Sequence, residues 1–317
     1  MAEELHLAPA VRAKAVNVVD DRAAPSAARR KCEIERPARG SAERGHRFLS
    51  LGIGQRTSAG VAELFDMALR GKRRDRAARS PELFLLERAF DDCLERIQSL
   101  GRRFDRALLI GCPDRSWPQR LAQLCERIDV RDAGQIYATQ AGGEIIVEDA
   151  WLPPEAEYDL VLAIGTFDTV NQLPLALRLV RHSMRGESLF IGALSGGETL
   201  PQLRAAMRAA DAVTGAAAPH VHPRIEPSAL APLLGDAGFV RPVVDVDRVA
   251  VSYASLDRLV SDLRSMAATN LLLGRPRFVG KAARAAARSA FSRAVEGERT
   301  VETFEILHFA AWTAAEG

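Results

Sequence analysis

The stretch that decides the fold is Ile191-Gly-Ala-Leu-Ser-Gly-Gly-Glu-Thr-Leu-Pro-Gln-Leu-Arg204. It ends an apolar strand, crosses a flexible bend at residues 195–197 and enters a helix. The helix has its own start signal, because Thr199 and Gln202 have capping-box spacing and Pro201 suits a first-turn position. A strand, a glycine-containing bend and a capped helix predict a junction at which an open α/β sheet places a ligand.

The same alternation of strands and helices continues on both sides of this junction. Residues 158–164 form a continuous apolar run, which is typical of a parallel strand covered on both faces. The predicted strands are residues 106–110, 128–130, 144–147, 158–164, 188–193, 239–246, 248–253 and 303–313. The predicted helices begin near residues 61, 81, 118, 173, 199, 227, 255 and 275. This order predicts a parallel, doubly wound sheet with helices on both faces.

The chain divides into an arm and one large domain. Residues 1–55 are predicted to be a disordered N-terminal arm, because they alternate Ala, Arg, Pro and acidic residues without an apolar face. Residues 56–317 are predicted to fold together, with N-terminal helices in 61–100 and a Rossmann-like core in 104–317. Helices at 255–295 are predicted as an insertion in that core.

Composition excludes several classes of protein. The net charge is +2 with 26% charged residues, and this balance gives no support to a nucleic-acid partner. No apolar run approaches the roughly 20 residues that span a bilayer. The four cysteines show neither Cys-x-x-Cys pairs nor metal-ligand spacing, so we expect a reducing compartment, the cytoplasm. Walker, nucleophile-elbow and His-Glu-x-x-His motifs are also missing from the sequence.

Residues that suit a nucleoside follow the first three predicted strands. The turn after the first strand contains Gly111 and Cys112, where backbone would approach a ligand, although with one glycine it is equally a plain turn. Asp129 or Asp132 would accept bonds from ribose hydroxyls, and Asp149 with its neighbour Glu148 would meet an adenine amino group. Each carboxylate alone is otherwise a solvated loop residue.

Candidate reacting groups follow the later strands. Asp168, after the fourth strand, is a candidate general base or a helix cap, and Thr166 before it completes the predicted cofactor-binding set. His220 and His222 would share one side of an extended segment. Because no third ligand stands near them, bonding to backbone or substrate is favoured over a metal, and no metal site is predicted.

Long stretches of the chain resemble one protein family. The matching stretches include Leu64-Phe-Asp66 with the basic run to Arg79, Glu148-Asp149-x-x-Leu-Pro, Tyr158-Asp-Leu-Val161, Val170-Asn-x-Leu-Pro174, Phe190-Ile-Gly-Ala-x-x-Gly-Gly-Glu-Thr-Leu200, Pro219-His-Val-His-Pro223, Leu233-Leu-Gly-x-Ala-Gly-Phe239, Val244-Asp-x-Asp247, Val251-x-Tyr253 and Leu259-x-x-Asp-Leu263. They are similar to the complex I assembly factor 5 group, relatives of the malonyl-carrier-protein methyltransferase of biotin synthesis. The opening stretch is the most specific of them.

The resemblance implies a seven-stranded class I methyltransferase fold, S-adenosylmethionine as cofactor and a protein substrate, a subunit of respiratory complex I. It places the bend Ser195, Gly196 and Gly197 on the substrate side with His220 and His222, and it adds Tyr253 to the catalytic candidates Asp168 and His220.

The chain also departs from the family pattern at two places. Where the family has an acid and three glycines in the first turn, this chain has Leu109, Gly111, Pro113 and Arg115, and Asp168-Thr169 replaces a His-Trp pair. Three hypotheses therefore stand: a methyltransferase acting on a protein or a small acid, an arginine hydroxylase of a complex I subunit, and a non-catalytic assembly factor with a degenerate cofactor turn.

Overall fold

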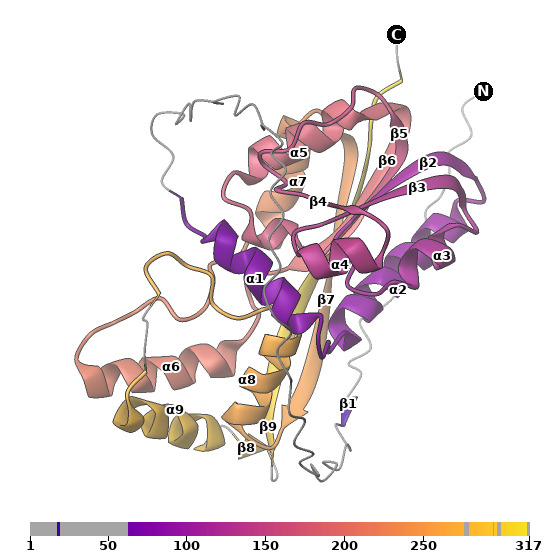
Figure 1. The fold of residues 1–317 in the computed structure, drawn as a ribbon. Helices are drawn as coiled ribbons and strands as arrows, with labels where there is room; N and C mark the ends of the chain where they lie inside the picture. The colour runs from indigo at the N-terminus through magenta and orange to yellow at the C-terminus, as the bar shows by residue number, and fades with distance from the viewer. Residues whose placement is uncertain (1–17, 20–62, 276–278, 294, 297–298, 316–317) are drawn as a thin grey trace, which may run out of the picture. The chain divides into compact units, whose positions relative to one another are not determined.

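The computed structural model describes residues 18–19, 63–275, 279–293, 295–296 and 299–315, which form a sheet covered by helices (Figure 1). The predicted N-terminal arm lies outside the described residues, apart from the short strand β1 (Val18–Val19). This strand pairs in parallel with the edge strand β7 (Val240–Tyr253), with Val18 opposite Val251.

The central sheet has the predicted doubly wound topology. Its seven main strands lie in the order β4 (Glu144–Ile145), β3 (Cys125–Asp132), β2 (Phe104–Ile110), β5 (Tyr158–Ile164), β6 (Met184–Ser195), β9 (Arg299–Trp312) and β7. β9 is antiparallel to both of its main neighbours, and the pairs from β4 to β6 are all parallel. β8 (Val295–Glu296) extends β9 as an antiparallel neighbour. This arrangement is the class I methyltransferase fold that the sequence predicted.

Helices cover both faces of the sheet. Between the strands lie α1 (Met67–Ala77), α2 (Phe84–Ser99), α3 (Trp117–Leu121), α4 (Gln135–Gln140), α5 (Leu173–Ser183), α6 (Pro201–Thr214), α7 (Pro227–Asp236), α8 (Leu256–Ser265) and α9 (Lys281–Arg293), with a 3₁₀ turn at Phe167–Thr169. One apolar core joins α2, α3, α6, α8 and α9 to one face, and a second joins α5 and α7 to the other. The strand residues alternate between these two cores, as the pleat requires.

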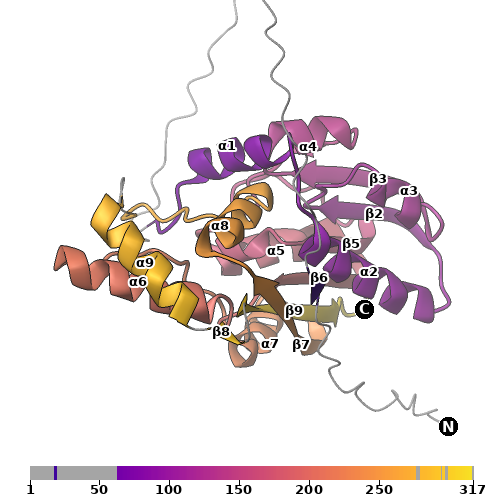
Figure 2. The ribbon, with the colours of Figure 1, turned by 90° about the horizontal axis from the view of Figure 1, so that it is seen from below.

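Two predicted elements differ in extent from the observed ones. The strands expected at 239–246 and 248–253 are one strand, because Asp247 stays in register with β9 and its carboxylate pairs with Arg88 of α2 at 2.6 Å. The helix expected from residue 275 as a surface element is α9, whose Ala283, Ala287 and Phe291 are buried. Small alanines let α9 pack closely beside α6 (Figures 1 and 2).

The start of α6 also differs from the prediction. Thr199 does not cap this helix, since its hydroxyl bonds Glu305 of β9 and Ser195. Instead the carboxylate of Glu302, also in β9, accepts the amide protons of Gln202 and Leu203. A carboxylate is favourable at a helix N-terminus, so the sheet itself caps the helix.

The first described helix lies further along the chain than expected. The sequence pattern placed a helix from residue 61, but α1 begins at Met67 because the Asp66 carboxylate accepts the amide of Leu69 at 2.8 Å. It includes most of the basic run at 70–79, and Arg70 and Arg74 of this run are buried. No helix in the described part of the chain is long and apolar enough to cross a membrane.

Candidate functional site

The turn after β2 brings together four of the predicted cofactor residues, Gly111, Cys112, Asp132 and Thr166. Gly111 has a φ of +80°, and a Cβ there would lie 2.3 Å from the carbonyl oxygen of Ile164 and 2.6 Å from Thr166 Cγ2. The Cys112 amide donates to Asp132 Oδ2 at 2.9 Å. Only glycine fits such a position, because this turn passes close to the end of β5. The approach of a ligand to this turn stays a prediction. We call this region the β2–β3 edge.

Arg74 of α1 forms an ion pair with the Asp132 carboxylate at this edge. Arg74 donates from Nε to Asp132 Oδ1 at 2.7 Å and from Nη2 to Oδ2 at 2.5 Å. The amide of Gly134 fills a further acceptor position on Oδ1 at 2.7 Å, and Asp132 is fully buried. Burial disfavours the Arg74 cation, but the Asp132 charge outweighs it, so the pKa of Arg74 is raised. Asp132 is therefore completely satisfied by the protein.

A second arginine of α1, Arg70, forms an ion pair with the carboxylate of Glu148. Arg70 forms two bonds to this carboxylate, at 2.6 and 2.7 Å, and a third to the carbonyl oxygen of Thr166 at 2.9 Å. Both side chains are buried, with 4% and 1% of their surface exposed. Arg70 and Arg74 stand one helical turn apart, so they project from the same face of α1, which lies beside α4 (Figures 1 and 2).

The residues of the β2–β3 edge do not fit S-adenosylmethionine in this arrangement. The cofactor's ribose and adenine would need free carboxylate acceptors, and both buried carboxylates are paired with arginines. Asp149, which the sequence assigned to the adenine, accepts the Gln172 amide at 2.9 Å. Sequence reasoning missed the two arginines, because it assigned them to a basic stretch after the first predicted helix; their spacing of four residues was the available signal.

Asp129 lies apart from the other predicted cofactor residues. It pairs with Leu108 in the middle of β3, and its carboxylate contacts Arg106 and the hydroxyl of Tyr158 at 2.8 and 2.9 Å. Of the two aspartates that the sequence offered for the ribose, Asp132 is the one at the carboxyl end of the strand. The burial of Asp132 by a distant helix was not visible in the sequence.

A cavity of about 120 Å³ lies at the carboxyl ends of β5 and β6. It is lined by Arg70 and Arg74 of α1 and by an apolar wall from α2, the end of α8 and the middle of β9, which includes Leu85, Leu86 and Met266. Asp168, Ser195 and His222, predicted for the catalytic or substrate side, all line it. We call it the β5–β6 cavity.

Two opposite charges face this cavity without forming an ion pair with each other. Burial raises the pKa of Asp168, and the positive charges of Arg224 and Arg70 only partly oppose the shift. Burial likewise lowers the pKa of Arg224 to about 10, despite the charge of Asp168. Nε and Nη1 of Arg224 are buried and have no hydrogen-bond partner in the described part of the chain. Charged groups left in this state are typical of a binding site.

The two histidines of the 220–222 segment have different partners. His220 Nε2 lies 2.7 Å from the Asp211 carboxylate. His222 Nε2 accepts the Leu271 amide at 2.6 Å, and burial together with Arg224 and Arg73 lowers the pKa of His222 to about 3. His222 is therefore neutral, with its proton on Nδ1. The two histidines thus contact different groups, a side-chain carboxylate for His220 and a backbone amide for His222.

Gly196 and Gly197, in the bend after β6, allow a close approach of the backbone to neighbouring side chains. A Cβ on Gly196 would lie 2.5 Å from Glu305 Oε1, and one on Gly197 would lie 2.2 Å from Glu226 Oε1. Both glycines thus let the chain pass between two carboxylates. Tyr253, the remaining catalytic candidate, is 1% exposed in β7 and is not among the residues that line the cavity.

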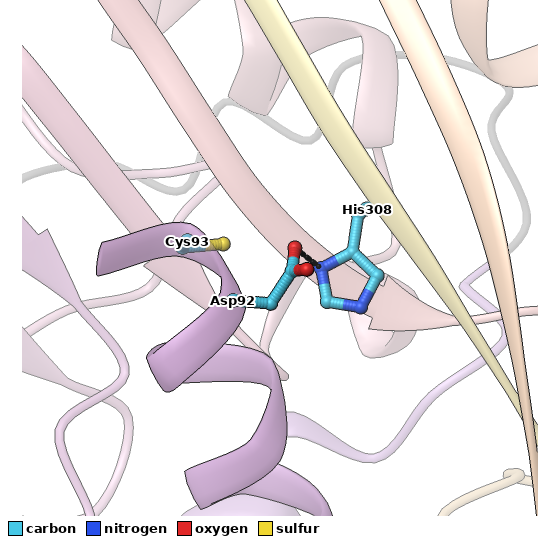
Figure 3. Close-up of side chains that lie close together, drawn as sticks. All are labelled: Asp92, Cys93 and His308. Carbon is cyan, nitrogen blue, oxygen red and sulfur yellow. Dashed lines mark ion pairs between the residues drawn. The ribbon is translucent and has the colours of Figure 1, made fainter. Parts of the chain in front are cut away.

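A separate cluster of possible metal ligands lies between α2 and β9 (Figure 3). Asp92, Cys93 and His308 place one ligand atom each within 4.8 Å of the others. However, the Asp92 carboxylate already contacts His308 at 2.9 Å and Arg96 at 2.6 Å. Burial raises the pKa of Cys93, which keeps its thiol protonated. The contacts are those of an ion-pair network that fastens α2 to the sheet.

Comparisons with known proteins place this geometry in context. No family model matches the sequence. Mouse "Arginine-hydroxylase NDUFAF5, mitochondrial" is 28% identical over 303 residues, which cover 88% of this chain and 86% of the relative. The malonyl-[acyl-carrier protein] O-methyltransferase of Laribacter hongkongensis is 30% identical over 166 residues, 49% of this chain and 54% of that protein. These similarities confirm the resemblance expected from the sequence.

Among solved structures, the YcgJ protein from Bacillus subtilis is similar in fold. It superposes with a TM-score of 0.50 at 10% identity, covering 72% of this chain and all of that one. At this identity the likeness concerns the fold alone, and it agrees with the strand order of the sheet.

Proposed function

We propose that this chain, which is NDUFAF5-like and has the class I methyltransferase fold, modifies an arginine side chain of a partner protein by hydroxylation. The partner we propose is a subunit of respiratory complex I. The observation that carries the proposal is Asp168, which faces the β5–β6 cavity and whose carboxylate forms no ion pair with a described residue. The proposed reaction is the one named for the similar NDUFAF5 proteins, which are called arginine hydroxylases. The cavity offers a place for the substrate side chain.

The cavity suits an arginine side chain in two respects. A guanidinium offers a fork of N–H donors that matches a carboxylate, and this charge-assisted bond would favour the ionised form of Asp168. The apolar wall formed by Leu85, Leu86 and Met266 would pack against the methylene stem of the arginine and exclude water. The protein would thereby bind and orient the carbon chain that is oxidised.

Hydroxylation converts a C–H bond into a C–OH group, and we propose dioxygen as the oxidant: one oxygen atom enters the C–H bond, the other leaves as water, and a separate reductant supplies two electrons and two protons. Protein side chains do not supply them. In the proposed role this chain positions the substrate arginine, and neutral His222 lines the same cavity without adding charge.

Mass spectrometry of complex I subunits tests the proposal. Subunits are compared between cells that contain the protein and cells that lack it. We expect one arginine-containing peptide to lose the mass of an oxygen atom in the deletion cells. Restoring the wild-type gene returns the mass, and Asp168→Asn does not, whereas the matched change Asp129→Asn at a distant strand position does. Loss of a methyl mass would instead support methyl transfer.

A second candidate is an assembly factor without catalysis. The arginine pairs at the β2–β3 edge favour it, because they fill the positions that a nucleoside would need. Titration of the purified protein with S-adenosylmethionine separates the possibilities. Saturable binding below millimolar concentration would argue for methyl transfer. No binding, together with unchanged arginine masses in deletion cells, would leave the assembly factor.

A further inference from the structure

A groove rich in arginine adjoins the β5–β6 cavity. It has a volume of about 550 Å³ and shares His222 and Arg224 with the cavity. The guanidinium groups that line it come from α1, α8 and two loops: Arg73, Arg76, Arg224, Arg264 and Arg275. We call this surface the arginine groove.

The arginine groove carries an excess of positive charge. No aspartate or glutamate is among the described residues that line it. One carboxylate nearby, Asp66, contacts Arg275 at 3.2 Å. Burial and the like charges of Arg275 and Arg76 lower the pKa of Arg73, which means that these cations destabilise one another. An anionic occupant would relieve this repulsion.

Two of these arginines are free to contact a partner. Arg76 and Arg264 are exposed, and no hydrogen bond or ion pair joins the guanidinium group of either one to a described residue. Arg73 and Arg275, by contrast, also donate to the carbonyl oxygens of Asn270 and Leu272, which fixes their positions. Fixed and free cations side by side form a surface that is complementary to several carboxylates in a row.

We propose that the arginine groove binds an acidic segment of the substrate protein that flanks the arginine to be modified. This inference rests on the proposed function for the identity of the occupant, because the groove leads to the cavity that would receive the arginine. Arg224 stands at the junction, with Nε and Nη1 unpaired. It would contact the carboxylate nearest to the target residue.

Fluorescence anisotropy with four labelled peptides of equal length tests the inference on the full chain. One pair carries a central arginine with either three glutamates or three glutamines beside it, and the other pair carries alanine in place of the arginine. We expect both acidic peptides to bind about tenfold more tightly than their neutral counterparts at low ionic strength. This preference should shrink as salt is added, because exposed charges are screened.

Charge-reversal variants locate the site. Arg76→Glu and Arg264→Glu should each weaken binding of the acidic peptides severalfold and leave the neutral peptides unaffected. Arg178→Glu is the matched control, since Arg178 is exposed on α5 and lies outside the groove. Equal binding of acidic and neutral peptides would overturn the inference, as would an equal loss in the Arg178→Glu control or tighter binding of a labelled oligonucleotide.

The same experiment distinguishes this inference from the proposed function. The acidic peptide with alanine tests the groove alone, because it has no residue to modify. If this peptide binds but no oxygen is found on any complex I arginine, the proposed reaction fails and the groove still stands. If oxygen is found but acidic flanks have no effect, the groove inference fails alone.

Discussion

The β2–β3 edge and the β5–β6 cavity lie along the same end of one sheet, yet they treat charge in opposite ways. At the edge, Asp132 and Glu148 each form a bidentate ion pair with an arginine. At most 7% of the surface of each of these four side chains is exposed. In the cavity, Asp168 and Arg224 form no such pair with any residue in the described part of the chain. The buried carboxylates of the edge are neutralised by ion pairs within the protein. The charged groups of the cavity are available to a ligand, which is the basis of the proposed function.

The contrast shows that two regions at the same end of one sheet can differ in how their charged groups are paired. In an open α/β sheet both regions lie at carboxyl ends of strands, where ligands are expected. Here the N-terminal helix α1 supplies to one of them the contacts that a ligand would otherwise make. Among the described residues, the cavity keeps Nε and Nη1 of Arg224 without a hydrogen-bond partner, and for this reason we place the proposed function there.

The largest expected effect comes from breaking an ion pair at the edge. Arg74→Met should lower the free energy of unfolding by about 3 to 5 kcal/mol, because it leaves Asp132 buried without a counter-charge. Urea denaturation measures the change. The double variant Arg74→Met with Asp132→Asn should recover part of the loss, and Arg178→Met serves as an exposed control. A loss below about 1 kcal/mol would mean that the pair is not buried in solution.

Gly111→Ala should have the next largest effect. Its Cβ would overlap the Ile164 carbonyl oxygen in a backbone that already has positive φ, so we expect a loss of about 3 kcal/mol. Gly142 is the matched control, since its φ is +71° and nothing lies within 4 Å of its Cβ position. Gly142→Ala should therefore show only the backbone cost, about 1 to 2 kcal/mol. Equal losses in the two variants would contradict close packing at the first turn.

His222 predicts a pH dependence that belongs to the cavity. Its folded pKa of about 3 lies below the ordinary value of 6.5, so the unfolded chain binds the extra proton between these limits. Stability should then fall as pH decreases through this window, by about 1 kcal/mol per pH unit from this residue. Unfolding curves at pH 7 and pH 5 measure it. The variant His222→Asn should show a smaller difference between the two pH values than the wild type.

Asp168→Asn in the cavity and Asp132→Asn at the edge should change the stability of the protein in opposite directions. Because burial raises the pKa of Asp168, the ionised form is penalised at neutral pH, and a neutral amide should stabilise the protein. The same substitution at Asp132 should destabilise it, since it breaks the pair with Arg74. Thermal unfolding at pH 7 compares the two variants. Destabilisation by both would mean that Asp168 has a structural partner in solution.

Local pattern was sufficient for much of the fold. The apolar run 158–164 coincides with β5, and Ser255 caps α8 through the Arg258 amide, as its position before a helical pattern predicted. Such features depend on neighbouring residues, whose periodicity the sequence displays directly. Elements controlled by distant partners were predicted poorly. The cap of α6 comes from Glu302, 99 positions away from Leu203, and was therefore assigned to Thr199.

The same distinction applies to the candidate site. The close turn at Gly111 follows from a strand, a glycine and a helix in sequence order, and it was predictable. The pair Arg70–Glu148 joins residues 78 positions apart, and the sequence showed each only as a charged residue in a charged region. Their function as mutual partners depends on the packing of α1, which no local pattern encodes.

Asp129→Asn should have the smallest effect on stability. It tests whether an acidic residue that belongs to neither the β2–β3 edge nor the β5–β6 cavity has a function of its own. Asp129 lies in the middle of β3, with 36% of its side chain exposed, beside Arg106. An ion pair this exposed contributes less than about 1 kcal/mol, so the variant should unfold close to the wild type. It should also bind the acidic peptides with unchanged affinity, as anisotropy would show. A clear loss of peptide binding would place a third functional region on the sheet and would contradict the assignment of function to the β5–β6 cavity.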